Sequence, residues 1–134
     1  MVCSVRLEKS HRPSILLVED DPVNQKVAKQ MLRHLGFQPD LAANGLEAIQ
    51  ALEDRHYDII LMDIQMPKMN GLEATKAIRS RFPADEQPHI IAVTAYAMTY
   101  DREKCISAGM DDYLSKPITL EDLKEIISRY SRHE

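Results

Sequence analysis

The sequence predicts an α/β fold in which a five-stranded parallel sheet is covered by helices on both faces. Short apolar runs rich in Ile, Leu and Val at 14–18, 57–62 and 89–93 are typical of strands buried on both faces. Apolar residues at helical spacing follow each of these runs. Strands that alternate with helices in this way pair in parallel through right-handed crossovers.

Composition and charge narrow the class of protein. Hydrophobic residues make up 44% of the 134 residues, and the net charge of −4 gives no reason to expect a nucleic-acid or membrane surface. Cys3 and Cys105 are expected to be free thiols in a reducing compartment. Neither a signal peptide nor a membrane span is predicted. We therefore expect a flexible tail or linker at 1–13, one domain at 14–134, and a cytoplasmic location.

The first strand and helix have clear local boundaries. The strand at 14–18 ends in acidic residues, Asp21 suits the N-cap of a helix, and Pro22 is favoured at the first helical position. Gly36 is a natural C-terminal stop. The predicted apolar face of this helix consists of Val23, Val27, Ala28, Met31, Leu32 and Leu35.

The second unit combines an edge strand with a short helix. Residues 37–43 alternate in polarity as a strand does, and Pro39 places them at a sheet edge because proline lacks an N–H. Asn44 and Gly45 are expected to make the turn, and apolar residues at 46–52 predict the helix.

Two further units follow the strand at 57–62. Asn70 with Glu73 three residues later resembles a capping box and predicts a third helix. A polar loop at 82–88 leads to the strand at 89–93, which ends in Thr94.

The next helix, at 99–108, is stopped by Gly109. Its apolar face is thin, and consists chiefly of Met98, Cys105 and Ile106. A helix that buries so little is expected to be among the less stable elements.

The chain closes with a strand at 111–114 and a helix opened by Thr119 with Asp122. An edge position for the second strand satisfies the strand order 2-1-3-4-5, the flavodoxin-like doubly wound arrangement with five helices. The apolar stripe of the last helix is Leu120, Leu123, Ile126, Ile127 and Tyr130.

In this arrangement, ligands bind beyond the carboxyl ends of the strands, where the strand order reverses between the first and third strands. Polar residues stand at four of these strand ends. They are Glu19, Asp20 and Asp21 after the first strand, Asp63 after the third, Thr94 after the fourth and Lys116 after the fifth.

Converging acids need a counter-charge, because two carboxylates about 4 Å apart repel by roughly 4 kcal/mol at an effective dielectric constant of about 20. Lys116 supplies one positive charge, and Mg²⁺, which prefers carboxylate ligands, supplies more. His34, His56 and His89 are scattered and show no zinc spacing. An acidic magnesium pocket with a lysine and a threonine indicates phosphoryl chemistry, with Asp63 as the nucleophile.

At this point the chain resembles the receiver domains of two-component response regulators, and most of all those of hybrid sensor histidine kinases. The resemblance covers residues 14 to about 130. Four motifs carry the resemblance to receiver domains: 15–21, 61–67 with Asn70 and Gly71, 93–95, and 113–117. Two further motifs, 22–25 and 71–74, carry the resemblance to the hybrid-kinase type.

The resemblance implies a metal site. Asp20 and Asp63 would bind Mg²⁺ directly, together with the backbone carbonyl of Gln65, and Glu19 would act through water. Two positions depart from the family pattern. Glu19 stands where many relatives have Asp, and Asp21 stands where hybrid-kinase receivers often have Asn.

The resemblance also implies a phosphoacceptor signalling domain rather than an enzyme, although one that assists its own phosphorylation and dephosphorylation. Asp63 would take phosphate from a histidine kinase or phosphotransfer protein, and a downstream effector would read the result. Thr94 and Lys116 would bind the phosphoryl group, and Ala95 would keep access open. Thr94 and Tyr113 would switch the face formed by 99–108, 111–114 and 119–130, and the Lys116–Pro117 bond would be cis.

Three other functions remain to be weighed. An aspartate-dependent phosphatase needs a second Asp two residues after the nucleophile, where this chain has Gln65. A nucleotide- or flavin-binding domain needs a glycine-rich phosphate loop, whereas the acids at 19–21 repel phosphate. A pseudo-receiver that only docks partners would not need the retained Asp63, Thr94 and Lys116.

Overall fold

The computed structural model describes residues 13–64, 71–94 and 99–130, and places five strands in one parallel sheet. The strand order is β2-β1-β3-β4-β5, which confirms the predicted doubly wound topology and the edge position of the second strand. The strands are β1 (Ile15–Val18), β2 (Asp40–Ala42), β3 (Ile59–Asp63), β4 (His89–Thr94) and β5 (Asp112–Ser115).

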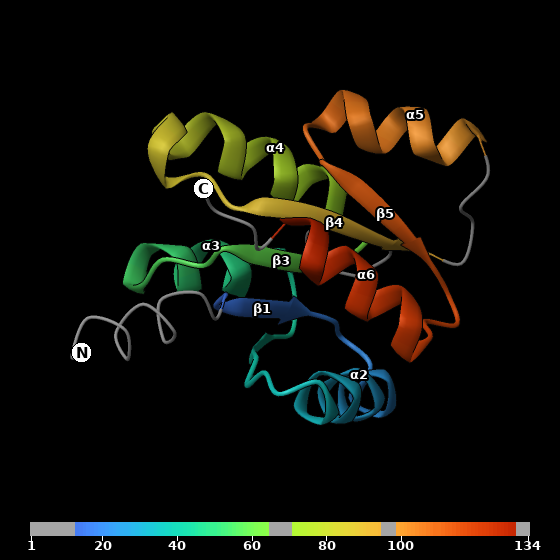
Figure 1. Cartoon of the computed structure of the whole chain (residues 1–134). Helices are drawn as coiled ribbons and strands as arrows, with labels where there is room; N and C mark the ends of the chain where they lie inside the picture. Colours follow the sequence, from blue (N-terminus) through green and yellow to red (C-terminus); the bar gives the residue numbers. More distant parts are fainter. Residues whose placement is uncertain (1–12, 65–70, 95–98, 131–134) are drawn as a thin grey trace.

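Helices cover both faces of the sheet (Figure 1). On one face lie α2 (Pro22–His34) and α6 (Leu120–Tyr130), and on the other lie α3 (Gly45–Asp54), α4 (Gly71–Arg81) and α5 (Thr99–Ala108). A short 3-10 helix, η1 (Ala84–Glu86), precedes β4. Among the described residues, no helix has the length and apolar character that a membrane crossing requires.

The two layers of the core are built by alternate residues of the same strands. In β3, Ile60 and Met62 pack toward α3, α4 and α5, whereas Ile59 and Leu61 pack toward α2 and α6. All four side chains are fully buried. Burial of each contributes about 1.5–3 kcal/mol, so the apolar run that precedes Asp63 holds the end of β3 rigidly in place.

The predicted helix boundaries are mostly confirmed. The Asp21 side chain accepts a hydrogen bond from the Val23 N–H and caps α2. Gly36 and Gly109 have φ angles of 97° and 107°, the left-handed conformation that favours glycine at a helix end. The Thr119 hydroxyl accepts a hydrogen bond from the Asp122 N–H at the start of α6.

Some local predictions are wrong. Val23 and Val27 were expected on the buried face of α2, but they are 67% and 46% exposed. Asn44 does not form a turn with Gly45: it caps α3, and its side chain accepts the Glu47 N–H. The strand predicted at 37–43 is shorter, and only Asp40–Ala42 pair with β1.

The weak apolar face of α5 is confirmed in part. Cys105 is buried as predicted, but Ile106 is 57% exposed, so this part of the predicted apolar face of α5 is not covered. Met98, Cys3 and the predicted cap Asn70 lie outside the described residues.

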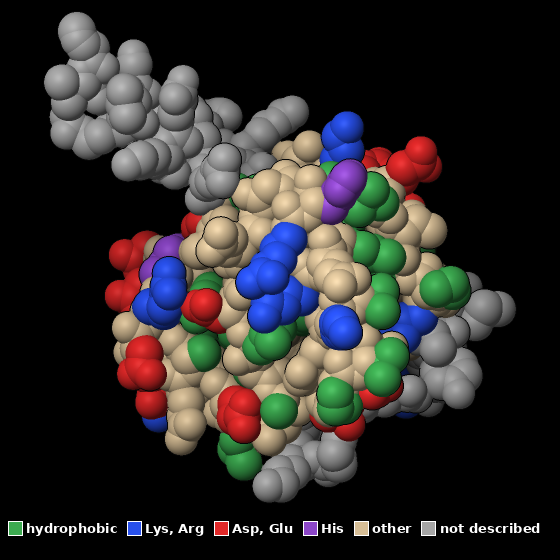
Figure 2. All heavy atoms as spheres, turned by 90° about the horizontal axis from the view of Figure 1, so that it is seen from below, with side chains coloured by type: hydrophobic (Ala, Val, Ile, Leu, Met, Phe, Trp, Pro, Cys, Tyr) green, Lys and Arg blue, Asp and Glu red, His purple; other side chains and the backbone are tan. Residues whose placement is uncertain are grey.

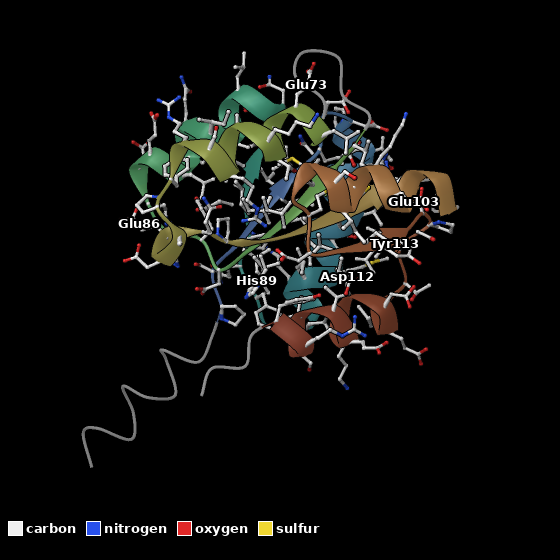
Figure 3. The ribbon with its side chains drawn as sticks, turned by 90° about the horizontal axis from the view of Figure 1, so that it is seen from above. Glu73, Glu86, His89, Glu103, Asp112 and Tyr113 are labelled. Atoms are coloured by element: carbon white, nitrogen blue, oxygen red, sulfur yellow. The ribbon has the colours of Figure 1, made fainter. Side chains whose placement is uncertain are left out.

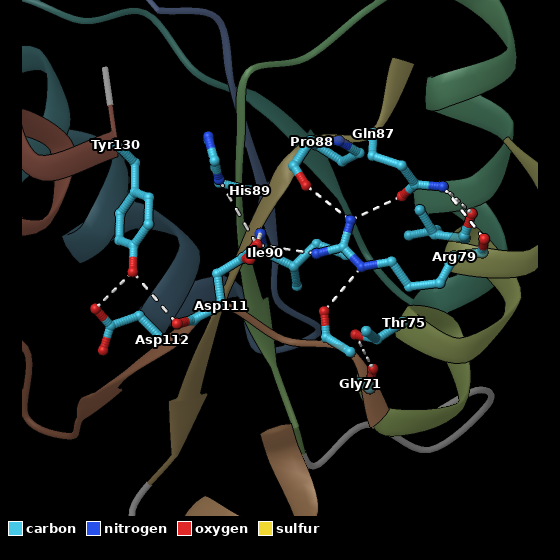
Figure 4. Close-up of polar contacts among 12 residues, drawn as sticks. Gly71, Thr75, Arg79, Gln87, Pro88, His89, Ile90, Asp111, Asp112 and Tyr130 are labelled. Carbon is cyan, nitrogen blue, oxygen red and sulfur yellow. Dashed lines mark hydrogen bonds and ion pairs between the residues drawn. The ribbon is translucent and has the colours of Figure 1, made fainter. Parts of the chain in front are cut away.

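Arg79 connects several segments at the end of the sheet where β4 and β5 begin (Figure 4). From α4, Arg79 Nε donates to the Gly109 carbonyl at 2.8 Å, and Nη2 pairs with Asp111 Oδ2 at 2.9 Å. Its Nη1 donates to Gln87 Oε1 at 2.7 Å and to the Pro88 carbonyl at 2.9 Å. Arg79 therefore joins α4, the end of α5 and the segments that lead into β4 and β5.

We predict that Arg79→Met lowers the free energy of unfolding by about 2–3 kcal/mol, because it leaves two carbonyls and the 34% exposed carboxylate of Asp111 without their charged donor. Urea denaturation followed by far-UV circular dichroism measures this change. The control is Arg81→Met on the same helix, where the exposed pair with Glu53 should contribute less than about 0.5 kcal/mol. Equal losses in the two variants would contradict the anchoring role.

Candidate functional site

The polar strand ends meet at one edge of the sheet, beside the reversal point between β1 and β3. Asp63 is the last residue of β3, and Glu19 follows β1 directly. Thr94 is the last residue of β4, and Lys116 follows β5. Since parallel strands end at the same edge, the topology alone places these side chains near one another.

Three acids form the centre of the site. One carboxylate oxygen each of Glu19, Asp20 and Asp63 lies within 4.8 Å of the others. Glu19 and Asp63 are only 5% and 3% exposed, whereas Asp20 is exposed. Oxygen ligands at this spacing, with one side open to solvent, suit a hard divalent cation such as Mg²⁺.

Lys116 partly balances the two buried acids. Its Nζ lies 3.5 Å from Asp63 Oδ2 and 3.7 Å from Glu19 Oε1. One ammonium group thus faces two carboxylates, and the cluster keeps a surplus of negative charge when all its members are ionised. This surplus is the electrostatic feature that favours a bound cation.

Burial and the neighbouring acid both act on the pKa of Glu19. Burial raises the pKa of Glu19 above its ordinary value of 4.5, and the neighbouring charge of Asp63 raises it further. A hydrogen bond from the Asp21 N–H to Glu19 Oε2, at 3.2 Å, and the charge of Lys116 lower the pKa in part. The net direction is upward, so the site favours a proton or a cation on this carboxylate.

The remaining predicted residues fall into three groups. Thr94 is buried at the site edge, and Tyr113 lies half-buried on β5 (Figure 3). The Lys116–Pro117 peptide is cis, as predicted. Gln65 and Ala95 lie outside the described residues.

Two residues that the sequence analysis names only as parts of family motifs support the site through contacts that it did not predict. Gln25 Nε2 donates to the Glu19 carbonyl at 2.5 Å, a contact that no sequence pattern announces. Gly71 packs against the end of β3, where a Cβ would lie 2.6 Å from the Asp63 carbonyl oxygen and 2.9 Å from Ile64 Cα. Its position in the family motif at the start of a predicted helix is the signal in the sequence that marks this glycine.

An apolar recess of about 440 Å³ opens beside the acids, between α2 and the segment that follows β5. Glu19 and Lys116 line one end of it. Its other walls are largely apolar and include Val27, Met31, Val93 and Ile118.

Comparisons with known proteins find receiver domains and histidine kinases. The response regulator receiver domain family matches residues 15–128. Hybrid signal transduction histidine kinase G of Dictyostelium discoideum is 43% identical over 132 residues, which cover 97% of this chain and 4% of that protein. Probable histidine kinase 1 of Oryza sativa is 41% identical over 151 residues, which cover 90% of this chain and 16% of that protein. The chain thus spans only a small part of these curated relatives.

Solved structures agree. The receiver domain of the sensor histidine kinase PA1611 from Pseudomonas aeruginosa is 45% identical with a TM-score of 0.81, over 90% of this chain and 98% of that one. Its crystal structure holds a magnesium ion in the active-site cleft. A second match is the co-crystal structure of the histidine phosphotransfer protein Ypd1 with the receiver domain of Ssk1 from Saccharomyces cerevisiae. The matched chain is 32% identical to this one with a TM-score of 0.80, and the match covers 90% of this chain and 89% of that one.

We predict that Glu19→Gln stabilises the metal-free protein at neutral pH. The pKa of Glu19 is raised in the folded state, so above pH 4.5 the unfolded state releases this proton more readily than the folded state does. The free energy of unfolding therefore falls as the pH rises through the folded-state pKa. Thermal unfolding in EDTA should therefore show a variant that melts at a higher temperature than the parent at pH 7, with the difference vanishing below pH 4.5.

Glu86→Gln, at the exposed η1 far from the acids, controls for the loss of one negative charge. A Glu19→Gln variant that melts below the parent protein at pH 7 in EDTA would show that the carboxylate is not under electrostatic strain.

Proposed function

Because this chain belongs to the response regulator receiver domain family, we propose that it is a phosphoryl-accepting signalling module in which Asp63 is the acceptor. The observation that carries the proposal is the placement of Asp63: a buried carboxylate at the end of a rigid strand, 3.5 Å from Lys116 and within the acidic cluster. The likeness to histidine kinase receivers further supports the proposal.

In the proposed reaction, a carboxylate oxygen of Asp63 attacks the phosphorus atom of a phosphohistidine. The P–N bond breaks, the imidazole leaves with the electron pair of that bond, and an acyl phosphate forms on Asp63. Lys116 neutralises negative charge on the phosphoryl oxygens, and the Thr94 hydroxyl donates a hydrogen bond to one of them. The same groups assist the later hydrolysis of the acyl phosphate.

The reaction is proposed to depend on Mg²⁺. The donor set fits this cation because it consists of carboxylate oxygens that lie close together and face solvent on one side. Asp20 and Asp63 would hold the ion together with the backbone carbonyl of Gln65, and Glu19 would act through water. When bound, the ion supplies positive charge against the phosphoryl oxygens.

Competing functions are less well supported. A phosphatase of the aspartate type lacks its second acid, since Gln65 stands at that position. A pseudo-receiver is disfavoured by the retained Asp63, Lys116 and Thr94, which all lie at one edge of the sheet.

We propose that the phosphoryl donor is a histidine kinase or a histidine phosphotransfer protein that docks on α2. Val23 and Val27 are exposed on this helix, and Val27 also lines the recess beside Lys116. Figure 2 shows hydrophobic side chains around a group of basic ones on the face seen from below, where α2 lies. The complex of Ypd1 with the Ssk1 receiver supports such a partner.

Phosphorylation is proposed to switch α5, β5 and α6, and a downstream effector would read this face. Thr94 would move toward the phosphoryl group, and the ring of Tyr113 would turn inward. The short apolar face of α5, with Ile106 exposed, supports a helix that shifts at low cost.

We predict that the protein gains the mass of one phosphoryl group when it is treated with acetyl phosphate and Mg²⁺, and that Asp63→Asn does not. Intact-protein mass spectrometry measures this. Asp85→Asn in the exposed η1 serves as the matched control and should react like the parent. In the same comparison, beryllofluoride should alter amide exchange in α5 and β5 of the parent only.

Phosphate retained by Asp63→Asn, or absent from the parent, would overturn the acceptor role. Phosphorylation without any change of amide exchange in α5 and β5 would leave the acceptor role intact and overturn the switch.

We predict that Val27→Gln slows transfer from phosphorylated Ypd1 about 10-fold without changing the rate with acetyl phosphate, because the loss of a well-packed apolar contact costs roughly 1–2 kcal/mol of docking energy. Ile106→Gln, an exposed apolar residue on the opposite face of the sheet, is the control. Radiolabel transfer measures the first rate, and mass spectrometry the second. Equal rates with Ypd1 for the parent and Val27→Gln would place the docking face elsewhere.

A further inference from the structure

The turn between β1 and α2 carries two of the three clustered acids, Glu19 and Asp20, as neighbours in the chain. Hydrogen bonds fix it from several sides. The Glu19 N–H donates to the Ala42 carbonyl at 3.0 Å, and Glu19 Oε2 accepts the Asp21 N–H at 3.2 Å. The Glu19 carbonyl accepts a hydrogen bond from Gln25 Nε2 at 2.5 Å.

The contact from Gln25 acts on the peptide that joins the two acids. The carbonyl of Glu19 and the N–H of Asp20 belong to one planar peptide group, which rotates only as a unit. A rotation of this plane changes the directions in which both carboxylates leave the backbone. The Gln25 side chain therefore controls a degree of freedom that the two acids share.

Gln25 is itself held by the helix. Its backbone N–H donates to the Asp21 carbonyl at 2.9 Å in the first turn of α2, and its side chain is half-buried. Asp21 caps the same helix through the Val23 N–H, so α2 keeps its N-terminal hydrogen bonds without the Gln25 amide. The side-chain contact thus serves the turn that bears the acids rather than the helix.

We propose that Gln25 is a positioning residue for the magnesium ligands, acting through the Glu19 carbonyl and not by contact with the ion. This inference rests on the proposed function, because it takes the acidic cluster to be a Mg²⁺ site. Groups that orient the ligands of a metal typically change its affinity about 10–100-fold when they are removed. An effect near the lower end is expected, because the hydrogen bond from the Glu19 N–H to the Ala42 carbonyl and the one from the Asp21 N–H to Glu19 Oε2 remain.

The test compares Gln25→Met with Gln30→Met, two neutral changes of the same kind on one helix. Methionine keeps the length and helical preference of glutamine but donates no hydrogen bond. Gln30 is exposed on α2 and is the matched control. Isothermal titration calorimetry with MgCl₂ measures affinity, and thermal unfolding in EDTA measures stability without the metal. Gln25→Ala replaces Gln25→Met if the methionine variant does not fold.

We expect Gln25→Met to raise the dissociation constant for Mg²⁺ about 10-fold, and Gln30→Met to leave it unchanged. With acetyl phosphate, Gln25→Met should need about 10-fold more Mg²⁺ for half-maximal phosphorylation but should reach the parent rate at saturation. The same unfolding temperature for both variants in EDTA would separate this effect from a general loss of stability.

Three outcomes decide the question. An unchanged Mg²⁺ affinity with a lower unfolding temperature would make Gln25 a structural residue only, and the proposal would be overturned. A parent that binds no Mg²⁺ would overturn it as well. A parent that is not phosphorylated, but whose Mg²⁺ affinity falls in Gln25→Met, would support the positioning role and overturn the proposed acceptor function.

Discussion

The burial of two carboxylates at one edge of the sheet is the constraint on which the site depends. Glu19 and Asp63 are almost completely shielded from water, and the single ammonium group of Lys116 lies between them. Buried acids are costly unless opposite charge or hydrogen bonds compensate them. The fold carries this cost because β1 and β3 are anchored by apolar side chains on both faces, so their ends cannot separate to relieve the repulsion. The cluster is thereby held in an arrangement that favours added positive charge.

The opposite end of the sheet is held in another way. There Arg79 satisfies carbonyls and a carboxylate from three segments, and the pair between Arg129 and Asp112 joins α6 to β5. The acid-rich edge thus has more carboxylates than cations, whereas at the far edge Arg79 and Arg129 pair with Asp111 and Asp112. A change of charge at Asp63 consequently acts on one end of a sheet whose other end is fixed.

Sequence reasoning predicts most of the fold because the signals are local and strong. Asp21 with Pro22, and the isolated Gly36 and Gly109, mark helix ends through backbone chemistry that depends little on tertiary contacts. The convergence of acids at strand ends follows from topology, and this is why the composition of the candidate site could be anticipated.

What the sequence could not show depends on packing and on surfaces. Val23 and Val27 follow the helical period as well as any buried residue, and only the three-dimensional arrangement leaves them uncovered. Gln25 and Gly71 belong to motifs of the family, but their contacts with backbone atoms of the site could be found only in the structure.

The exposed face of α2 has a further consequence for signalling. Because α2 and α5 lie on opposite faces of the sheet, a donor protein docked on α2 as proposed would leave α5 uncovered, so the proposed input and output faces could be engaged at the same time without steric competition (Figure 1).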